Sequence, residues 1–220
     1  VGPAGDTIVI KYYPNTTRMQ MQGKPLFIFN EVVSMLSENN DKQDDVVDAS
    51  LKYCNIDMKE EDIYEEMEEV LGSDLYKFLS KSQRIILSTS FILSKLEGNL
   101  GDNSVLLQPA NRVYEGFVKK IYAQKGLECD GEKQLGKFFD WPDKSHPEMK
   151  SLYASTLDKE TLEGFTSMFK FYSIYRHPYM HATAYDYSTA IIENRDVAEE
   201  KLKEVITSMK SWYKWYSEMK

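Results

Sequence analysis

The sequence has 220 residues, of which 42% are hydrophobic and 28% charged, so it is long enough for one substantial domain of an ordinary water-soluble protein. The two cysteines have no nearby cysteine or histidine partner, which excludes a disulfide framework and a zinc-finger spacing and favours the reducing cytoplasm. The longest apolar run, residues 85–93, is too short to cross a bilayer, and the formal net charge of −8 argues against a broadly basic nucleic-acid-binding face.

The first residues predict a small mixed segment. The opening "VGPAG" resembles what remains of a cleaved tag, so we expect residues 1–5 to take no part in the fold and the chain to be truncated at its N-terminus. Residues 7–13 and 16–22 have the composition of strands and predict a hairpin, and residues 25–36 predict a helix with proline in its first turn. Because an isolated hairpin is barely stable in water, residues 1–40 are interpreted as the C-terminal remnant of an α+β domain.

From about residue 41 the apolar residues recur at helical spacing to the end of the chain. This pattern predicts a mainly α fold, in which five or six helices form a bundle over residues 41–220. The predicted helices cover residues 44–56, 59–72, 74–98, 108–126 and 158–176 and a long final segment from about 187 to 219, while residues 127–157 are predicted to be irregular.

Acidic residues concentrate between positions 38 and 74. This segment holds 14 of them and only three lysines, Lys42, Lys52 and Lys59. The simplest interpretation is a solvated face shared by successive helices. The alternative is a docking surface for a basic partner.

The stretch "FYSIYRHPYMHATAYD", residues 171–186, holds two of the three histidines in the chain. Pro178 disfavours a helix interior and restricts the residue before it, so we expect one helix to end near Arg176 and the next to begin at Pro178. His181 would then lie at a helix N-terminus, which attracts anions and keeps an imidazole neutral enough to act as a base. Arg176 adds a permanent cation whose planar donors suit a phosphate group. These residues form a candidate phosphodiester site, although the alternative is that Arg176 pairs with a carboxylate of the bundle and the histidines cap a turn.

The run "RHPYMH" fits the Arg-x4-His motif of HEPN ribonucleases, with Arg176 and His181 as its fixed residues. Longer segments resemble the RnlA family of toxins from type II toxin–antitoxin modules. The resemblance extends with interruptions from residue 19 to 181, through "MQMQGKPLFIFNEVVSML" (19–36), "ANRVYEGFVKKIYAQKGL" (110–127), "GKFFD" (136–140) and "LYASTLDKETLEGFTSMFKFYSIYRHPYMH" (152–181). It implies that residues 41–220 form a HEPN-like helical domain and that the segment before them is the end of a second small α+β repeat.

The resemblance also implies a metal-independent endoribonuclease that needs no cofactor. A 2′-hydroxyl group would attack the adjacent phosphate and leave a 2′,3′-cyclic phosphate. His181 would act as general base or acid, and Arg176 would hold the phosphate and stabilise the charge that develops on it. Glu115 in "RVYEG" matches a glutamate that joins the family's site, and it could equally be a buried partner of Arg176.

Four further residues are candidates for substrate binding. Arg112 stands one helical turn before Glu115 and therefore on the same helix face. Lys119 would add positive charge to a cleft, and Tyr179 could stack on a base. His177 occupies a variable position of the motif, where a plain turn residue is the stronger interpretation.

The resemblance also implies partners. HEPN domains pair so that two motifs face one cleft, so we expect a homodimer with a composite active site. From the toxin family we expect an RNA substrate and a cognate antitoxin, and we expect no membrane association. A zinc site formed by His146, His177 and His181 is not expected, because their spacing does not fit such a site. The alternative function is a non-catalytic HEPN-like domain for dimerisation or partner binding, which would not need Arg176, His181 and Glu115 together.

Overall fold

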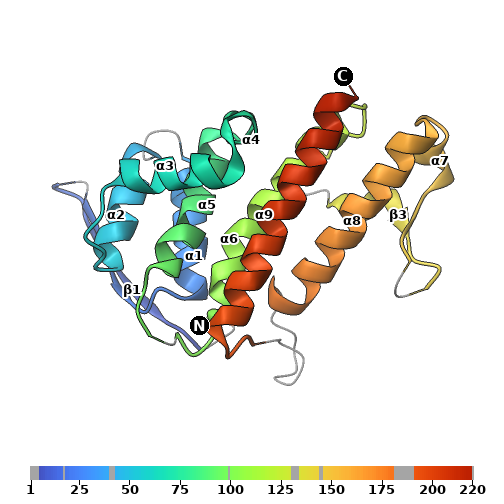
Figure 1. The fold of residues 1–220 in the computed structure, drawn as a ribbon. Helices are drawn as coiled ribbons and strands as arrows, with labels where there is room; N and C mark the ends of the chain where they lie inside the picture. Colours follow the sequence, from blue (N-terminus) through green and yellow to red (C-terminus); the bar gives the residue numbers. More distant parts are fainter. Residues whose placement is uncertain are drawn as a thin grey trace.

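The computed structural model describes residues 5–16, 18–39, 43–98, 100–129, 134–143, 146–180 and 191–219, and at residues 44 and 176–180 it describes the backbone alone. Within these ranges the fold is mainly α, as predicted, with a hairpin near its N-terminal end (Figure 1). The strands are β1 (Ile8–Tyr13), β2 (Arg18–Gly23), β3 (Phe139–Asp140) and β4 (Glu148–Met149). The helices are α1 (Phe27–Ser37), α2 (Val46–Tyr53), α3 (Glu60–Leu71), α4 (Ser73–Phe78), α5 (Lys81–Ser94), α6 (Leu107–Ala123), α7 (Ser151–Ala154), α8 (Lys159–Met180) and α9 (Arg195–Glu218), and 3-10 turns lie at η1 (Gln43–Asp45), η2 (Asn103–Leu106) and η3 (Leu135–Phe138).

The predicted hairpin of β1 and β2 is confirmed. The strands pair antiparallel, with Ile10 opposite Met21 and Tyr12 opposite Met19, so these four side chains share one apolar face. Ile8 and Met21 at the base pack against the helical core, whereas Ile10, Tyr12 and Met19 nearer the tip are exposed. The hairpin is therefore supported by the helices at its base only.

Helix α1 packs into the same core as α2, α5 and α6. Phe29 of α1 stacks on Tyr53 of α2 with the ring centres 4.7 Å apart. The buried side-chain amide of Asn30 donates to the main-chain carbonyl of Val105, just before α6, at 2.9 Å. The contacts of α1 thus extend across residue 40, and the division of the chain at that residue stays a prediction of the sequence.

Helix α6 lies at the centre of the bundle and packs against α5, α8 and α9 (Figure 1). Apolar residues recur at helical spacing along it, and Val113, Phe117, Ile121 and Tyr122 are all buried. Helix α8 runs antiparallel to α6, because Tyr122 stacks on Phe165 near the start of α8 while Tyr114 contacts Phe171 nearer its end, with ring centres 4.0 Å and 5.1 Å apart. The N-terminal turns of α6 therefore lie beside the C-terminal turns of α8.

The single helix predicted over residues 74–98 is wrong, because the chain forms α4 and α5 with a break at Leu79 and Ser80. Ser80 begins α5 in a capping box: its hydroxyl accepts the amide of Gln83 at 3.1 Å, and the side chain of Gln83 accepts the amide of Ser80 at 2.9 Å. This reciprocal pair satisfies two backbone donors that a helix start leaves open. The apolar spacing continues across the break, so periodicity alone does not reveal it.

The predicted helix end at Arg176 is also wrong. Helix α8 continues through Pro178 to Met180, so these residues lie in its last turns and not at the start of a new helix. Proline has a helical φ of about −65°, so a helix can pass through it with the loss of one hydrogen bond. No new helix therefore begins at Pro178, and the argument that a helix N-terminus there keeps His181 neutral does not hold. His181 itself lies outside the described residues.

Two smaller differences concern the second half of the chain. The sequence predicts the final helix from about residue 187, but residues 191–194 are not helical and α9 begins at Arg195, where the Asn194 side chain accepts the amide of Asp196 at 2.8 Å. Residues 127–157, predicted to be irregular, contain the short antiparallel pair β3–β4 and the single helical turn α7.

Candidate functional site

Two predicted site residues form an ion pair on α6. Nζ of Lys119 lies 2.7 Å from Oε1 of Glu115, four residues earlier in the helix. The side chain of Glu115 is 17% exposed and that of Lys119 is 31% exposed, so the pair is partly shielded from solvent. Asn111 stands four residues before Glu115 and therefore on the same stripe of the helix. Glu115 and Lys119 thus lie on one face of α6, as side chains four residues apart in a helix do.

Arg112 is directed toward α1. Its guanidinium lies 3.5 Å from the carboxylate of Glu31 and 3.1 Å from that of Glu38, just after the end of α1. To bind a phosphate of the substrate, Arg112 would have to break its ion pairs with these two carboxylates. Its predicted part in substrate binding stays a prediction, and its observed contacts join α1 to α6.

The last described turns of α8 are hydrogen-bonded to α6 at Asn111, one helical turn before Glu115. The side-chain amide of Asn111 donates to the main-chain carbonyl of Tyr175 at 3.3 Å. Arg176 follows Tyr175 directly, so the backbone that carries this arginine lies one residue from the contact with α6. Only the backbone of Arg176, His177 and Tyr179 is described, and the predicted roles of their side chains stay predictions.

The chain that follows residues 181–190 is anchored near the start of α6. The side-chain amide of Asn103 donates to the carbonyls of Ile192 and Glu193 at 3.1 Å and 2.9 Å, and the main-chain amide of Asn103 donates to Ile192 at 2.8 Å. Asp102 accepts the amide of Ile192 at 3.4 Å. The described backbone on both sides of the undescribed segment therefore makes hydrogen bonds to residues 102–111.

Aromatic and basic side chains surround the end of α8. Tyr175 stacks on Phe171 with ring centres 4.5 Å apart, and Nζ of Lys201 in α9 lies 5.4 Å from the centre of the Tyr175 ring. Burial raises the pKa of the phenols of Tyr114 and Tyr122 in α6, so both stay protonated at neutral pH and cannot take a proton from a substrate. Glu115 is the one carboxylate in the sequence of α6, and it can orient a cation or accept a hydrogen bond.

Among the residues that the structure describes, no group of three His, Cys, Asp or Glu side chains could hold a metal ion. His146 lies in an exposed loop, where its Nδ1 is 2.9 Å from the carboxylate of Asp143. None of the described helices combines the length and the apolar character that a membrane span requires.

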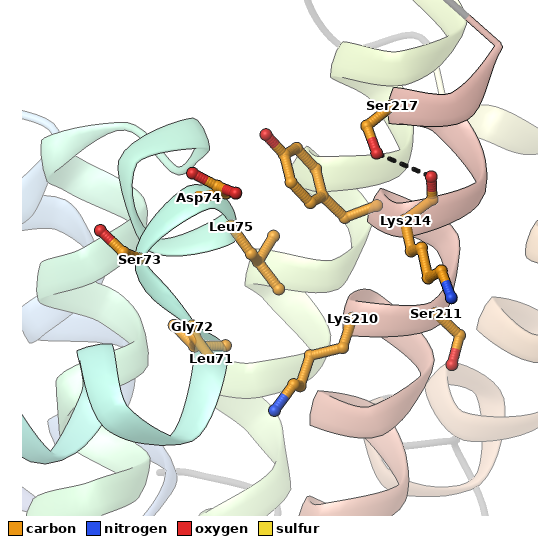
Figure 2. A pocket seen from close by; sticks show the side chains of 10 residues that line it. Leu71, Gly72, Ser73, Asp74, Leu75, Lys210, Ser211, Lys214 and Ser217 are labelled. Atoms are coloured by element: carbon orange, nitrogen blue, oxygen red, sulfur yellow. Dashed lines mark hydrogen bonds between the residues drawn. The ribbon is translucent and has the colours of Figure 1, made fainter.

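A groove of about 430 Å³ lies between the α3–α4 junction and the C-terminal half of α9 (Figure 2). Its lining includes Leu75, Lys210 and Lys214, and Nζ of Lys210 donates to the carbonyl of Val70 at 2.7 Å. Lys210 follows Lys201 by nine residues along α9, roughly 14 Å at the rise of a helix. The groove is thus distant from Tyr175, and none of the predicted site residues lines it.

The comparisons with known proteins agree on one family. Residues 59–183 match the family described as "RNase LS, bacterial toxin DBD domain", and residues 1–41 match the one described as "RNase LS, bacterial toxin". The mRNA endoribonuclease toxin LS of Escherichia coli (strain K12) is 23% identical over 177 residues, which are 80% of this chain and 49% of that protein. The mRNA endoribonuclease LsoA of Escherichia coli O157:H7 is 27% identical over 178 residues, 80% of this chain and 50% of that protein.

The chain thus spans about half the length of the curated relatives it matches. Among solved structures, the crystal structure of Escherichia coli toxin LsoA in complex with T4 phage antitoxin Dmd superposes with a TM-score of 0.66 at 21% identity. The superposition covers 99% of this chain and 90% of that chain, and it shows that the two share a fold.

Proposed function

Because this chain belongs to the RnlA family of bacterial toxins, we propose that it is an endoribonuclease whose active site lies between α6 and α8. The observation that carries the proposal is the hydrogen bond from Asn111 to the carbonyl of Tyr175, at 3.3 Å. This contact brings the turn that bears Arg176 against the helix that bears Glu115. The names of the two relatives, both mRNA endoribonucleases, support RNA as the substrate.

The proposed reaction is an attack within the RNA strand. The 2′-hydroxyl oxygen bonds to the neighbouring phosphorus while its proton passes to a general base, and the bond from phosphorus to the 5′-oxygen breaks. That oxygen receives a proton from a general acid, and the upstream fragment keeps a 2′,3′-cyclic phosphate. His181 serves as base or acid, and Arg176 holds the phosphate and stabilises the negative charge that develops on its oxygens.

Glu115 completes the proposed site. Its carboxylate orients the guanidinium of Arg176, and Lys119, 2.7 Å away, adds positive charge for the phosphate backbone. Arg176 and Lys119 can supply the charge stabilisation that a metal ion supplies in other nucleases, so we propose a reaction that is independent of metal ions. His177 and Tyr179 follow Arg176 in the chain, and Tyr179 is proposed to stack on a base.

The proposal includes partners. The relative LsoA has been solved with an antitoxin, which supports a cognate antitoxin for this chain. A homodimer with two Arg-x4-His motifs facing one cleft would double the cationic side chains at the phosphate. A cytoplasmic location is part of the proposal, because the proposed substrate is cellular RNA. The alternative, a non-catalytic dimerisation or partner-binding domain, predicts no cleavage under any condition.

The test is RNA cleavage in excess EDTA by the wild-type protein and by the Arg176→Ala and His181→Ala variants. We expect the wild type to cleave and both variants to lose at least about 100-fold in rate, the usual range for removal of an acid–base group or of a donor that stabilises developing charge. Cleavage that requires added metal, or that survives both substitutions, would contradict the mechanism. A folded wild-type dimer that never cleaves RNA would favour the alternative function.

A further inference from the structure

Asn111 is a polar residue at a core position of α6. It is 3% exposed, and its neighbours along the helix, Ala110, Val113 and Tyr114, are buried as well. Its amide donates to the carbonyl of Tyr175, 64 residues later in the chain, at 3.3 Å. A buried amide at this position needs a partner, because an unsatisfied buried polar group costs roughly 1–3 kcal/mol. The hydrogen bond is therefore a specific link between α6 and the end of α8.

The link meets α8 where the helix's own hydrogen bonding is interrupted. Pro178 has no N–H group, so the carbonyl of Ile174 receives no helical hydrogen bond from it. A proline inside a helix weakens the local ladder and favours a bend. Tyr175 is the next residue, and its carbonyl accepts a donor from outside the helix. Asn111 thus stabilises the one turn of α8 that proline destabilises.

The two ends of this link stand beside two proposed catalytic residues. Asn111 precedes Glu115 by four residues on one stripe of α6, roughly 6 Å along the helix. Tyr175 immediately precedes Arg176. We propose that Asn111 is a positioning residue: its amide holds the Arg176 turn of α8 about one helical turn from Glu115, within reach of a long arginine side chain, so that the carboxylate can orient the guanidinium. This inference rests on the proposed function, since it assumes that Arg176 and Glu115 act on one substrate.

A positioning role predicts a particular kinetic change. Without the link, the last turns of α8 separate more often from α6, and Arg176 spends less time in the reactive geometry. A misplacement of about 1 Å can reduce a rate by about 100-fold. We expect kcat to fall by about 10-fold to 100-fold in Asn111→Asp, which keeps the shape and removes the donor, and in Asn111→Ala, with a smaller change in KM.

Asn30 offers a matched control. It is 4% exposed, and its amide donates to the carbonyl of Val105 at 2.9 Å and to Oε1 of Gln108 at 3.0 Å. It therefore resembles Asn111 in burial and bonding but joins α1 to the start of α6. Asn30→Asp should lower the melting temperature as Asn111→Asp does while leaving α8 attached.

The experiment combines hydrogen–deuterium exchange with RNA cleavage kinetics on the full chain. Both Asn111 variants should show faster exchange over residues 172–180 and a lower kcat, and Asn30→Asp should show neither at matched stability. Unchanged exchange in both Asn111 variants overturns the inference whatever the activity. Faster exchange with an unchanged kcat also overturns it, because the link would then be structural only. A wild type that does not cleave RNA would remove the proposed function, and the exchange comparison would still decide whether Asn111 holds the turn.

Discussion

At the scale of single residues, Asp158 determines where the helix with the candidate arginine begins. Its carboxylate accepts the amide of Thr161 at 2.8 Å and the hydroxyl of Thr161 at 2.6 Å, the geometry of a helix N-cap. These hydrogen bonds stabilise the ionised carboxylate and lower the pKa of Asp158 from its ordinary value of 3.8. Asp158 is also the first residue of the helix that the sequence predicts over residues 158–176.

The Asp158→Ala variant should unfold at a lower temperature than the wild type, and the difference should depend on pH. Because the pKa of Asp158 is lower in the folded state, its stabilisation is complete above the unfolded value of 3.8 and is lost as the pH falls through the folded pKa. Thermal melts of both proteins between pH 7 and about pH 3 measure this. A difference that stays constant down to the lowest pH would show that the carboxylate does not act as a cap.

Glu115 is the described residue on which the proposed chemistry depends most. Glu115→Gln should reduce RNA cleavage by about 100-fold, because the neutral amide no longer orients a guanidinium by charge. Its effect on stability should be small, about 1 kcal/mol or less, since the ion pair with Lys119 is partly exposed. Glu163→Gln is the control, because Glu163 has the same spacing from Lys159 on α8, at 3.9 Å. Equal losses of activity in both variants would remove Glu115 from the site.

At the scale of secondary-structure elements, the packing of α8 on α9 depends on a glycine. Gly164 lies buried in α8, and a Cβ atom at this position would stand 2.4 Å from Cζ2 of Trp215 in α9. Alanine in place of glycine normally stabilises a helix by about 1 kcal/mol. Here the steric overlap with an aromatic ring should outweigh that gain, because overpacking costs about 1–3 kcal/mol.

Gly164→Ala should therefore lower the free energy of unfolding by about 1–2 kcal/mol, as measured by urea denaturation. In a Trp215→Ala background the same substitution should become neutral or stabilising, because the ring that it meets is gone. A stabilising effect of Gly164→Ala in the wild-type background would contradict the observed closeness of α8 and α9.

Elements with a clear apolar period could be predicted from the sequence, and breaks within them could not. The inward residues of α6 recur at helical spacing, so burial follows from the pattern alone. The break before α5 is different, because only the Ser80 and Gln83 capping signature marks it while the apolar residues continue. Proline normally ends a helix, but α8 continues through Pro178. The nearby hydrogen bond to Tyr175 comes from Asn111, 64 residues away in the sequence, and local patterns do not reveal it.

For the candidate site, too, contacts within one helix could be predicted from the sequence and contacts between distant segments could not. Glu115 and Lys119 were each candidates from the sequence, and they form an ion pair at the four-residue spacing of a helix face. The partners of Arg112 could not be predicted, because Glu31 and Glu38 lie 81 and 74 residues away in the sequence. Asn111 was missed as well, although an asparagine among the inward residues of an amphipathic helix is a signal that a buried polar contact exists.

At the scale of the whole molecule, the charge distribution constrains how RNA can bind. The protein carries a net charge of −8, and seven acidic residues of this excess lie in the twelve residues of α3. Helices α2 and α3 lie on the hairpin side of α6, whereas α8 lies on the other side (Figure 1). Helix α3 is thus separate from the proposed site between α6 and α8, and a docking surface for a basic partner on the acidic segment stays a hypothesis.

RNA binding should consequently involve few phosphate contacts. For the inactive His181→Ala variant we expect the logarithm of the affinity for single-stranded RNA to fall against the logarithm of salt concentration with a slope of about −1 to −2, the value for two or three contacts. Fluorescence anisotropy between about 50 and 200 mM salt measures this slope. A slope steeper than about −4 would indicate a broad basic surface that the charge distribution does not predict.

The most direct test of the central claim is the chemical nature of the ends that cleavage leaves. A short synthetic RNA would be incubated with the wild-type protein in excess EDTA, and the fragments would be weighed by mass spectrometry. Attack by the 2′-hydroxyl group predicts a 2′,3′-cyclic phosphate on the upstream fragment and a 5′-hydroxyl group on the downstream one, with neither product from Arg176→Ala. A 3′-hydroxyl group together with a 5′-phosphate would mean that water is the nucleophile, and would contradict the proposed roles of Arg176, His181 and Glu115.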